Sequence, residues 1–529
     1  MIYLPLISSL LVAVVAAGPS VTILNGTYEG YRLPSHKQDV FLGLPYAQPP
    51  VGSLRFQGPQ SLNTSWVGSR PAVEYSDVCM QYVADPGYPM SEDCLSLNII
   101  RPSNISDSDM LPVAVWIHGG GLYSGSSRQI NFTNFVYEGT ASGNSFIAVS
   151  INYRLNAFGF FWGSDELATH GSANNGLRDQ RLALKWIQEN ICFFGGDASK
   201  VTILVRARVV CPGGMAEKWP YNIKVPEVYT KELYMNLTIT TGCADSASAL
   251  ECLRALPTES LSAALNISST PVFSGTGLGP WLTQVDGDFL LDGPTESLDK
   301  QHFVPVPIMY TTTTDEATAF SFVNSVDTDA DFRDFIAAGG PDEAAISVIE
   351  ALYPKDLGLP AGWTPTVKEE ATYGAQWKRA VAFHTDVVET SSRRRTVDAW
   401  GAANGTAYSA IINILAPDDA ARLRSHHSVE LDYVFNNVNH QNQALQNMAK
   451  LMSRVWASFV MHLDPNFHQL HGVPFWPIWN ASGLKDTVGY NFVFNTNGSL
   501  DSRCYVEVDG YRLEQTRYIN SIMQSQMYY

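Results

Sequence analysis

Residues 113–125 read Val113-Ala-Val-Trp-Ile-His-Gly-Gly-Gly-Leu-Tyr-Ser-Gly125. The unbroken apolar run at 113–117 is typical of a strand that is buried on both faces. The glycines at 119–121 follow it directly, and without Cβ atoms they allow backbone N–H groups to point into a cleft. An ordinary glycine turn would look the same in sequence. A phosphate-binding loop is disfavoured, because no Lys-Ser/Thr pair follows at the required spacing.

Apolar runs of strand length alternate with helical patterns along the rest of the chain. Strands are predicted at 146–151, 201–204 and 306–310, and helices at 177–191 and 443–461. This alternation predicts an α/β fold with one large, mostly parallel, doubly wound sheet and helices on both of its faces. No linker divides the chain convincingly, so we expect one catalytic-type domain over residues 18–529.

The composition is that of a globular protein with an acidic surface. Of the 529 residues, 45% are hydrophobic and 16% are charged, and the formal net charge is -17. Such a surface repels phosphate backbones and anionic lipids, so a nucleic-acid or membrane-surface partner is disfavoured. The composition does not predict an oligomeric state.

Several features indicate export from the cell. Residues 1–17 are apolar and end in small side chains, which favours a signal peptide cleaved before Gly18; a membrane span needs about 20 apolar residues. No second stretch of spanning length occurs, so we expect a secreted, extracellular glycoprotein without a stable membrane anchor. Nine N-glycosylation sequons support this expectation, beginning at Asn25, Asn63, Asn104, Asn131, Asn236, Asn266, Asn404, Asn480 and Asn497.

The cysteine count is odd. The seven cysteines are Cys79, Cys94, Cys192, Cys211, Cys243, Cys252 and Cys504. Local disulfides are plausible between Cys79 and Cys94 and between Cys243 and Cys252, because each pair encloses a short loop in a chain expected to be secreted. The sequence leaves the state of the other three open.

An ordered set of motifs identifies a family. The motifs are Phe41 to Phe56 (FLGLPYAQPPVGSLRF), Ser91 to Asn98 (SEDCLSLN), His118 to Gly125, Asn152 to Gly159 (NYRLNAFG), Asn174 to Gln180 (NNGLRDQ), Phe194 to Asp197 (FGGD), Val285 to Phe289 (VDGDF) and Trp476 to Trp479 (WPIW). Together they resemble the type B carboxylesterases and lipases, the cholinesterase-like family of α/β-hydrolases. Secreted fungal members look closest. The resemblance covers nearly the whole chain after residue 17.

The resemblance implies a role for particular residues. Gly120 and Gly121 would donate to the oxyanion of a serine acyl-enzyme mechanism, Glu316 would be the triad acid and His427 the base. Taken alone, Glu316 would most often be a surface acid and His427 an exposed loop residue. The spacing to Glu430 selects His427 over its neighbour His426.

The resemblance also bears on ligands and stability. It implies a small-molecule or lipid ester as substrate, without a cofactor, and the sequence shows no convincing metal set. A structural ion pair is implied between Arg55 and Glu92. Only 14 residues separate Cys79 from Cys94, the loop that carries a lid in related lipases, and a lid this short favours an esterase over a lipase.

The nucleophile is missing from this pattern. After Leu204 the family continues into Gly-Glu-Ser-Ala-Gly, whose serine stands on a sharp strand-to-helix turn. Here residues 205–215 read VRARVVCPGGM, and no Gly-x-Ser-x-Gly occurs anywhere in the chain. A few dozen residues are predicted to be absent, namely the serine turn, its helix and the next strand. The fold is therefore expected to be locally incomplete around 204–214, and the chain to be inactive.

Two explanations compete for this gap: a non-catalytic binding or adhesion protein, and a defective gene model. Inactivation requires only one serine substitution, whereas deletion of a central strand and its helix exposes a large apolar area. At about 25 cal/mol per Å2 that loss exceeds the ~5–15 kcal/mol by which a protein is usually stable. This comparison favours the defective gene model.

Overall fold

The computed structural model describes residues 18–81, 87–103, 105–106, 108–205, 208–210, 227–268, 281–320, 326–355, 357, 373–414, 423–438, 442–479, 488–496 and 504–527. Several expectations lie outside these residues: the signal peptide at 1–17, Cys211, and the sequons at Asn104, Asn480 and Asn497.

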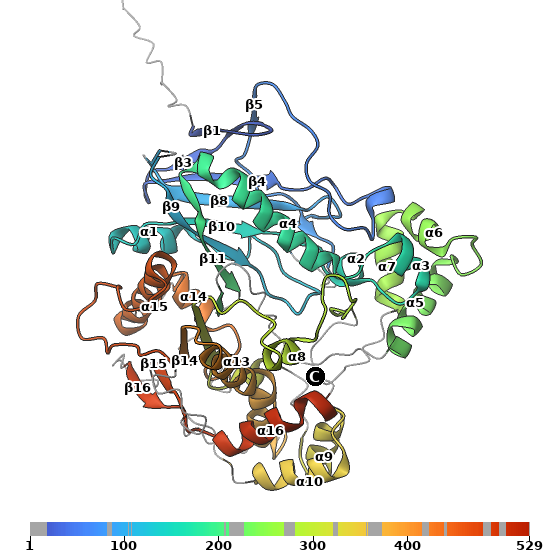
Figure 1. The fold of residues 1–529 in the computed structure, drawn as a ribbon, viewed down its shortest axis with the longest axis vertical. Helices are drawn as coiled ribbons and strands as arrows, with labels where there is room; N and C mark the ends of the chain where they lie inside the picture. The colour runs from blue at the N-terminus through green and yellow to red at the C-terminus, as the bar shows by residue number, and fades with distance from the viewer. Residues whose placement is uncertain are drawn as a thin grey trace, which may run out of the picture.

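A large mixed sheet forms the centre of the molecule (Figure 1). Within the described residues it has 11 strands in the order β16-β15-β14-β13-β12-β11-β9-β10-β8-β4-β3. They are β3 (Tyr31–Leu33), β4 (Gln38–Pro45), β8 (Ser96–Pro102), β9 (Leu111–Ile117), β10 (Ile147–Ile151), β11 (Gly196–Val205), β12 (Arg208–Val210), β13 (Ile308–Thr313), β14 (Ala407–Asn413), β15 (Tyr490–Asn495) and β16 (Tyr505–Val508). Two small sheets accompany it, one formed by β1 (Ser20–Ile23), β2 (Gly26–Glu29) and β5 (Ser69–Pro71), the other by β6 (Val78–Cys79) and β7 (Met90–Ser91).

The strand directions refine the predicted sheet. Strands β10, β9 and β11 are parallel, and so are β13, β14 and β15. The flanking pairs β10–β8, β8–β4, β4–β3 and β15–β16 are antiparallel. The predicted parallel arrangement therefore describes two blocks of three strands, while β12 between these blocks and the strands at both sheet edges are antiparallel.

Helices surround the sheet. They are α1 (Thr133–Ala141), α2 (Asn156–Phe160), α3 (Asp165–His170), α4 (Asn175–Asn190), α5 (Glu227–Thr241), α6 (Ala249–Ala255), α7 (Thr258–Ser268), α8 (Pro294–Asp299), α9 (Asp329–Ala337), α10 (Glu343–Leu352), α12 (Trp377–Thr385), α13 (Ser391–Ala402), α14 (Glu430–Val434), α15 (Gln443–His462) and α16 (Leu513–Gln526). The helices predicted at 177–191 and 443–461 correspond to α4 and α15. No helix in the described ranges is long and apolar enough to cross a membrane.

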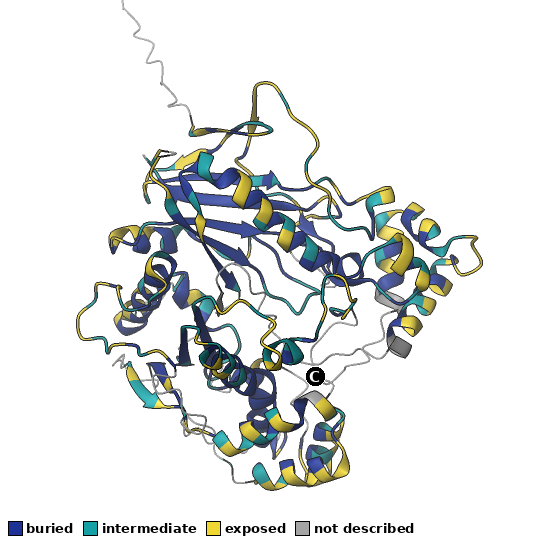
Figure 2. Cartoon of the chain, in the orientation of Figure 1, coloured by how far each residue is buried: buried dark blue, intermediate teal, exposed yellow. Residues whose placement is uncertain are grey.

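Side chains of the central strands point alternately to the two faces of the sheet, where they pack into two separate hydrophobic cores. Val113 and Val115 of β9 pack with Trp186 of α4 on one face of the sheet. Ala114 and Trp116 pack on the opposite face, in the core that also contains residues of α1 and α15. Because both faces are covered, the central strands are buried along their length (Figure 2). This arrangement explains why β9 reads as a continuous apolar run.

Strand β12 bridges the place where the fold was expected to be incomplete. It pairs antiparallel with β11, with Val210 opposite Ile203, and antiparallel with β13, with Val210 opposite Ile308. Only residues 206–207 separate β11 from β12, too few for a helix. Between β11 and β13 the sheet is thus continuous, but only through the three residues 208–210. The physical reason is that the backbone groups facing each other on β11 and β13 need hydrogen-bond partners.

Candidate functional site

The candidate catalytic residues follow the carboxyl ends of central strands of the sheet. Strands β9 and β11 are parallel, β12 is antiparallel to both β11 and β13, and β14 is parallel to β13. Strands β9, β13 and β14 therefore run in the same direction, and their carboxyl ends lie on the same side of the molecule. The loops that leave these ends carry Gly120, Glu316 and His427 respectively. In α/β sheets, ligands bind at the carboxyl ends of the strands.

Glu316 and His427 form a close acid–base pair although they are 111 positions apart in sequence. His427 Nδ1 lies 2.5 Å from Glu316 Oε2. The second carboxylate oxygen, Oε1, accepts a hydrogen bond of 2.7 Å from the backbone N–H of Thr313 at the end of β13. The side chains of Glu316 and His427 are only 6% and 10% exposed, and the ring of Phe320 packs 5.3 Å from the imidazole centre.

This contact can set the tautomer of the imidazole. A carboxylate that accepts the Nδ1 proton of a neutral histidine leaves the Nε2 lone pair available as a base. The adjacent His426 is turned differently, with its Nδ1 2.9 Å from the carbonyl oxygen of His427. The structure therefore brings His427, rather than His426, to Glu316, as the spacing argument predicted.

The glycine turn after β9 adopts a backbone that side chains would block. Gly120 has φ 120°, and a Cβ atom there would lie 2.0 Å from the carbonyl oxygen of Ser124. A Cβ atom at Gly125 would lie 2.3 Å from the carbonyl oxygen of Gly119. The turn thus folds tightly back on itself, which requires glycine at these positions.

His118, the first residue of this turn, has a structural role. Its ring stacks on Tyr153 with 4.4 Å between ring centres, and the Tyr153 hydroxyl donates a 2.9 Å hydrogen bond to the His118 carbonyl. Burial lowers the pKa of His118 to about 4. At neutral pH the imidazole is therefore uncharged, and it holds the start of the turn against the core.

The position expected to carry the nucleophile has no serine in the sequence. Strand β11 ends at Val205, and no serine occurs between Ser199 and Ser246. Ser124, in the glycine turn, donates a 3.2 Å hydrogen bond to the carbonyl of Gly120. Ser425, two residues before His427, donates a 2.7 Å hydrogen bond to the carbonyl of Ile412. Both of these hydroxyls thus donate hydrogen bonds to backbone carbonyls.

A second glutamate lies beside the acid–base pair, and sequence reasoning missed it. Glu389 is 3% exposed and lies in the π-helical turn η5 (Asp386–Thr390), between α12 and α13. Glu316, Glu389 and His427 each offer one donor atom, and these atoms lie within 4.8 Å of one another. The sequence signal for Glu389 was an acidic residue within the stretch 377–402, which is helical in the structure. The direction of its side chain could not be inferred from the sequence, because a π-helical turn shifts the register of the helix.

Comparison with known proteins identifies the family of this chain. A model of the carboxylesterase family matches residues 17–207 and 204–490. The chain belongs to the carboxylesterase family. The two matched segments of this carboxylesterase chain overlap at residues 204–207, where β11 ends.

Relatives of this carboxylesterase include secreted fungal enzymes. Lipase 4 of Diutina rugosa is 29% identical over 94% of this chain and 99% of its own length. Secreted lipase 1 of Botryotinia fuckeliana is 29% identical over 88% of this chain and 87% of its own length. The crystal structure of Aspergillus niger EstA superposes with a TM-score of 0.79 at 25% identity, covering 96% of this chain and 98% of that one. The α/β-hydrolase fold predicted from the motifs is confirmed.

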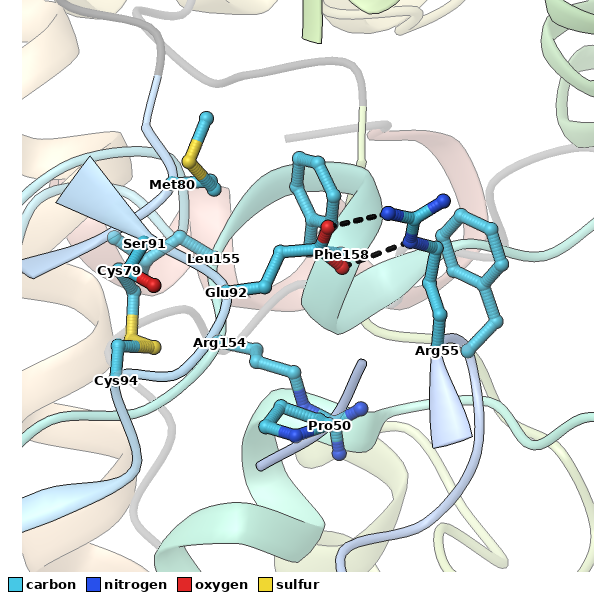
Figure 3. Close-up of a pocket in the computed structure, with 11 residues that line it drawn as sticks. Pro50, Arg55, Cys79, Met80, Ser91, Glu92, Cys94, Arg154, Leu155 and Phe158 are labelled. Atoms are coloured by element: carbon cyan, nitrogen blue, oxygen red, sulfur yellow. Dashed lines mark hydrogen bonds and ion pairs between the residues drawn. A yellow bond between two sulfur atoms is a disulfide. The ribbon is translucent and has the colours of Figure 1, made fainter. Parts of the chain in front are cut away.

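The ion pair expected in this carboxylesterase is present and buried. Arg55 Nη2 and Nε lie 2.5 Å and 2.8 Å from the two carboxylate oxygens of Glu92. Arg55 Nη1 also donates to the carbonyls of Leu253, Arg254 and Leu256. Figure 3 shows the two side chains facing each other beside the Cys79–Cys94 disulfide. Arg55 thus joins the segment after β4 both to the segment after β7, through Glu92, and to the end of helix α6, through these carbonyls.

Both predicted disulfides have bonded sulfur atoms in the structure. The S–S distances are 2.00 Å for Cys79–Cys94 and 2.08 Å for Cys243–Cys252. Cys192 and Cys504 are free within the described residues. These bonds close the loops that precede β8 and α6.

Most sequons within the described residues are accessible. Asn63, Asn131 and Asn404 are exposed, and Asn25 and Asn236 are partly exposed. Asn236 lies inside helix α5, where its sequon residue Thr238 is buried. Asn266 lies in α7, and its side chain is not among those described. The loop and turn sequons are therefore better placed for glycosylation than Asn236.

Proposed function

We propose that this chain is a secreted member of the carboxylesterase family that retains the acid and base of a serine ester hydrolase without its nucleophile. Two observations carry the proposal together: the buried Glu316–His427 pair at the carboxyl ends of β13 and β14, and a strand, β11, that is followed by no serine turn in the sequence. As written, the chain does not hydrolyse esters through an acyl-enzyme.

The roles of the remaining residues follow from the complete reaction. A serine hydroxyl would attack the ester carbonyl and pass its proton to Nε2 of His427, which Glu316 holds in the correct tautomer. The N–H groups of Gly120 and Gly121 would stabilise the oxyanion. The imidazolium then protonates the departing alkoxide, and water removes the acyl group by the same steps. Without the hydroxyl the first bond cannot form, which leaves at most the ~10^3–10^4-fold acceleration over water measured for triads lacking a member.

Covalent labelling tests the missing nucleophile directly. The purified chain is incubated with a fluorophosphonate probe and assayed on a p-nitrophenyl ester. The matched control is a repaired chain carrying Gly-Glu-Ser-Ala-Gly, its helix and the following strand between residues 204 and 213, together with the Ser→Ala version of that repair. We expect labelling and turnover in the serine repair alone. Stoichiometric labelling of the unrepaired chain would refute the proposal.

The gap has two possible origins, and the favoured one remains a defective gene model. The family model matches two segments of the chain, 17–207 and 204–490. A single break between them supports a deletion at one place rather than sequence divergence along the whole chain. Genomic DNA beneath residues 203–216 tests this origin. We expect an open reading frame that encodes the serine turn there. A contiguous frame encoding VRARVVCPGGM, with no alternative splice site, would contradict it.

One observation favours the alternative of a non-catalytic binding or adhesion protein. Strand β12 closes the sheet, so the two cores on its faces stay covered and the shortened chain can remain folded. Cooperative unfolding of a secreted, unlabelled chain would support a binding protein. Aggregation of the unrepaired chain alongside secretion of the repaired one would count against it.

For the repaired enzyme we propose soluble esters rather than emulsified triglycerides as substrates. The loop between Cys79 and Cys94 holds 14 residues and can cover little apolar surface. Activity should therefore be the same below and above the solubility limit of the substrate, measured on a short-chain triglyceride. An abrupt increase in rate when the emulsion forms would contradict this substrate choice.

A further inference from the structure

The proposed function gives no role to Glu389, which forms a cluster with Glu316 and His427. One donor atom from each lies within 4.8 Å of the others. Glu316 and Glu389 are 5% and 3% exposed, and the His427 side chain is 10% exposed. The three residues come from η3 (Glu316–Ala319), from η5, and from the loop before α14. Because separate packed elements hold them, the donor atoms are already assembled in the folded chain.

The ligand types of the cluster, two carboxylates and one imidazole, are those of a divalent metal site. An imidazole ligand disfavours Ca²⁺ and Mg²⁺, which prefer oxygen ligands, and suits Zn²⁺. We propose that Glu316, Glu389 and His427 bind one zinc ion.

The three donor atoms lie within 4.8 Å of one another and need side-chain movements to reach the spacing of a tetrahedral site. Zinc binds histidine nitrogen and carboxylate oxygen at about 2.0–2.2 Å, so two ligands lie about 3.4 Å apart. The 2.5 Å contact between His427 Nδ1 and Glu316 Oε2 has to open by about 1 Å for this, and side-chain rotation supplies such a movement. Zinc then replaces the proton between these atoms, and the neutral imidazole carries its proton on Nε2. The same imidazole can no longer act as a base, so zinc binding and ester hydrolysis exclude each other at this site.

This inference does not depend on the proposed function, because all three ligands are present with or without a serine. The test uses the full secreted chain, stripped with a chelator and titrated with zinc by calorimetry. Bound metal is counted by mass spectrometry, and Co²⁺ replaces Zn²⁺ to report the ligand field by visible absorption. The ligand variants are Glu389→Gln and His427→Gln. The control is Glu251→Gln, which removes a carboxylate that is 64% exposed.

We expect one tightly bound zinc per chain and a higher unfolding temperature with zinc. Each ligand variant should bind at least about tenfold more weakly, since even the loss of an outer hydrogen-bond partner costs that much, while the control binds normally. Far-ultraviolet circular dichroism checks that each variant is folded, and if one is not, the other and the cobalt spectrum decide. Equal affinity in all variants, the absence of stoichiometric binding, or aggregation of the wild type with and without zinc alike would overturn the proposal.

Discussion

The buried Arg55–Glu92 pair allows a sharp test of the structure through Glu92→Gln. The two side chains are 5% and 4% exposed, and Glu92 receives two charge-assisted hydrogen bonds from Arg55 and a 2.6 Å bond from Thr258. A glutamine keeps the shape of the side chain but leaves the guanidinium charge buried without its counterion. Breaking such a pair costs about 3–5 kcal/mol, a large part of a typical stability of ~5–15 kcal/mol.

A neighbouring ion pair provides the control for this measurement. Arg254 Nη1 lies 2.6 Å from Glu251, whose side chain is 64% exposed, so Glu251→Gln should cost only ~0–1 kcal/mol. Both variants are unfolded in urea and followed by tryptophan fluorescence under identical conditions. Glu92→Gln should lower the free energy of unfolding by at least ~2 kcal/mol more than Glu251→Gln. Equal losses in the two variants would refute the reasoning that burial determines the strength of this pair.

Three further predictions concern the core and the cysteines. Burial lowers the pKa of His118 to about 4 and of His384 to about 3, so the unfolded chain, with histidine pKa values near ~6.5, binds protons that the folded chain does not. The free energy of unfolding should therefore fall as the pH drops from about 6.5 towards 4. Urea midpoints at pH 7 and pH 5 measure this fall. The substitution His118→Asn should make the fall smaller, whereas the control His471→Asn, at an exposed residue, should leave it unchanged. Asp509→Asn should cost about 3–5 kcal/mol in the same urea assay, because this fully buried carboxylate binds both Arg393 and Arg394, and a loss below ~1 kcal/mol would argue against that network. Peptide mapping without reduction should recover Cys79 linked to Cys94 and Cys243 linked to Cys252; peptides that link Cys79 to Cys243 would contradict the fold around β6 and α6.

Sequence patterns located the elements whose side chains point in a regular way. The apolar run at 113–117 lies in β9, because a strand covered on both faces has no polar side to interrupt it. The apolar spacing at 443–461 corresponds to α15, which buries one face against α1 and α14. In these elements the local pattern and the tertiary environment agree.

Other elements depend on pairing partners that are distant in sequence. The antiparallel strands at the sheet edges were not predicted, since strand direction follows from the path of the chain rather than from local composition. Strand β12 formed in an atypical segment because its neighbours left unpaired backbone groups on both sides. Local sequence does not encode either outcome.

The sequence by itself determined the family, the predicted acid and base, and the lack of a serine between residues 199 and 246, because these depend only on which residues occur and in what order. Only the tertiary structure decided that Glu316 and His427 meet within 2.5 Å across 111 positions, that Glu389 joins them, and that β12 closes the sheet. The physical reason is that these contacts arise from packing between separate elements, and the positions of those elements are set by burial and backbone pairing over the whole chain.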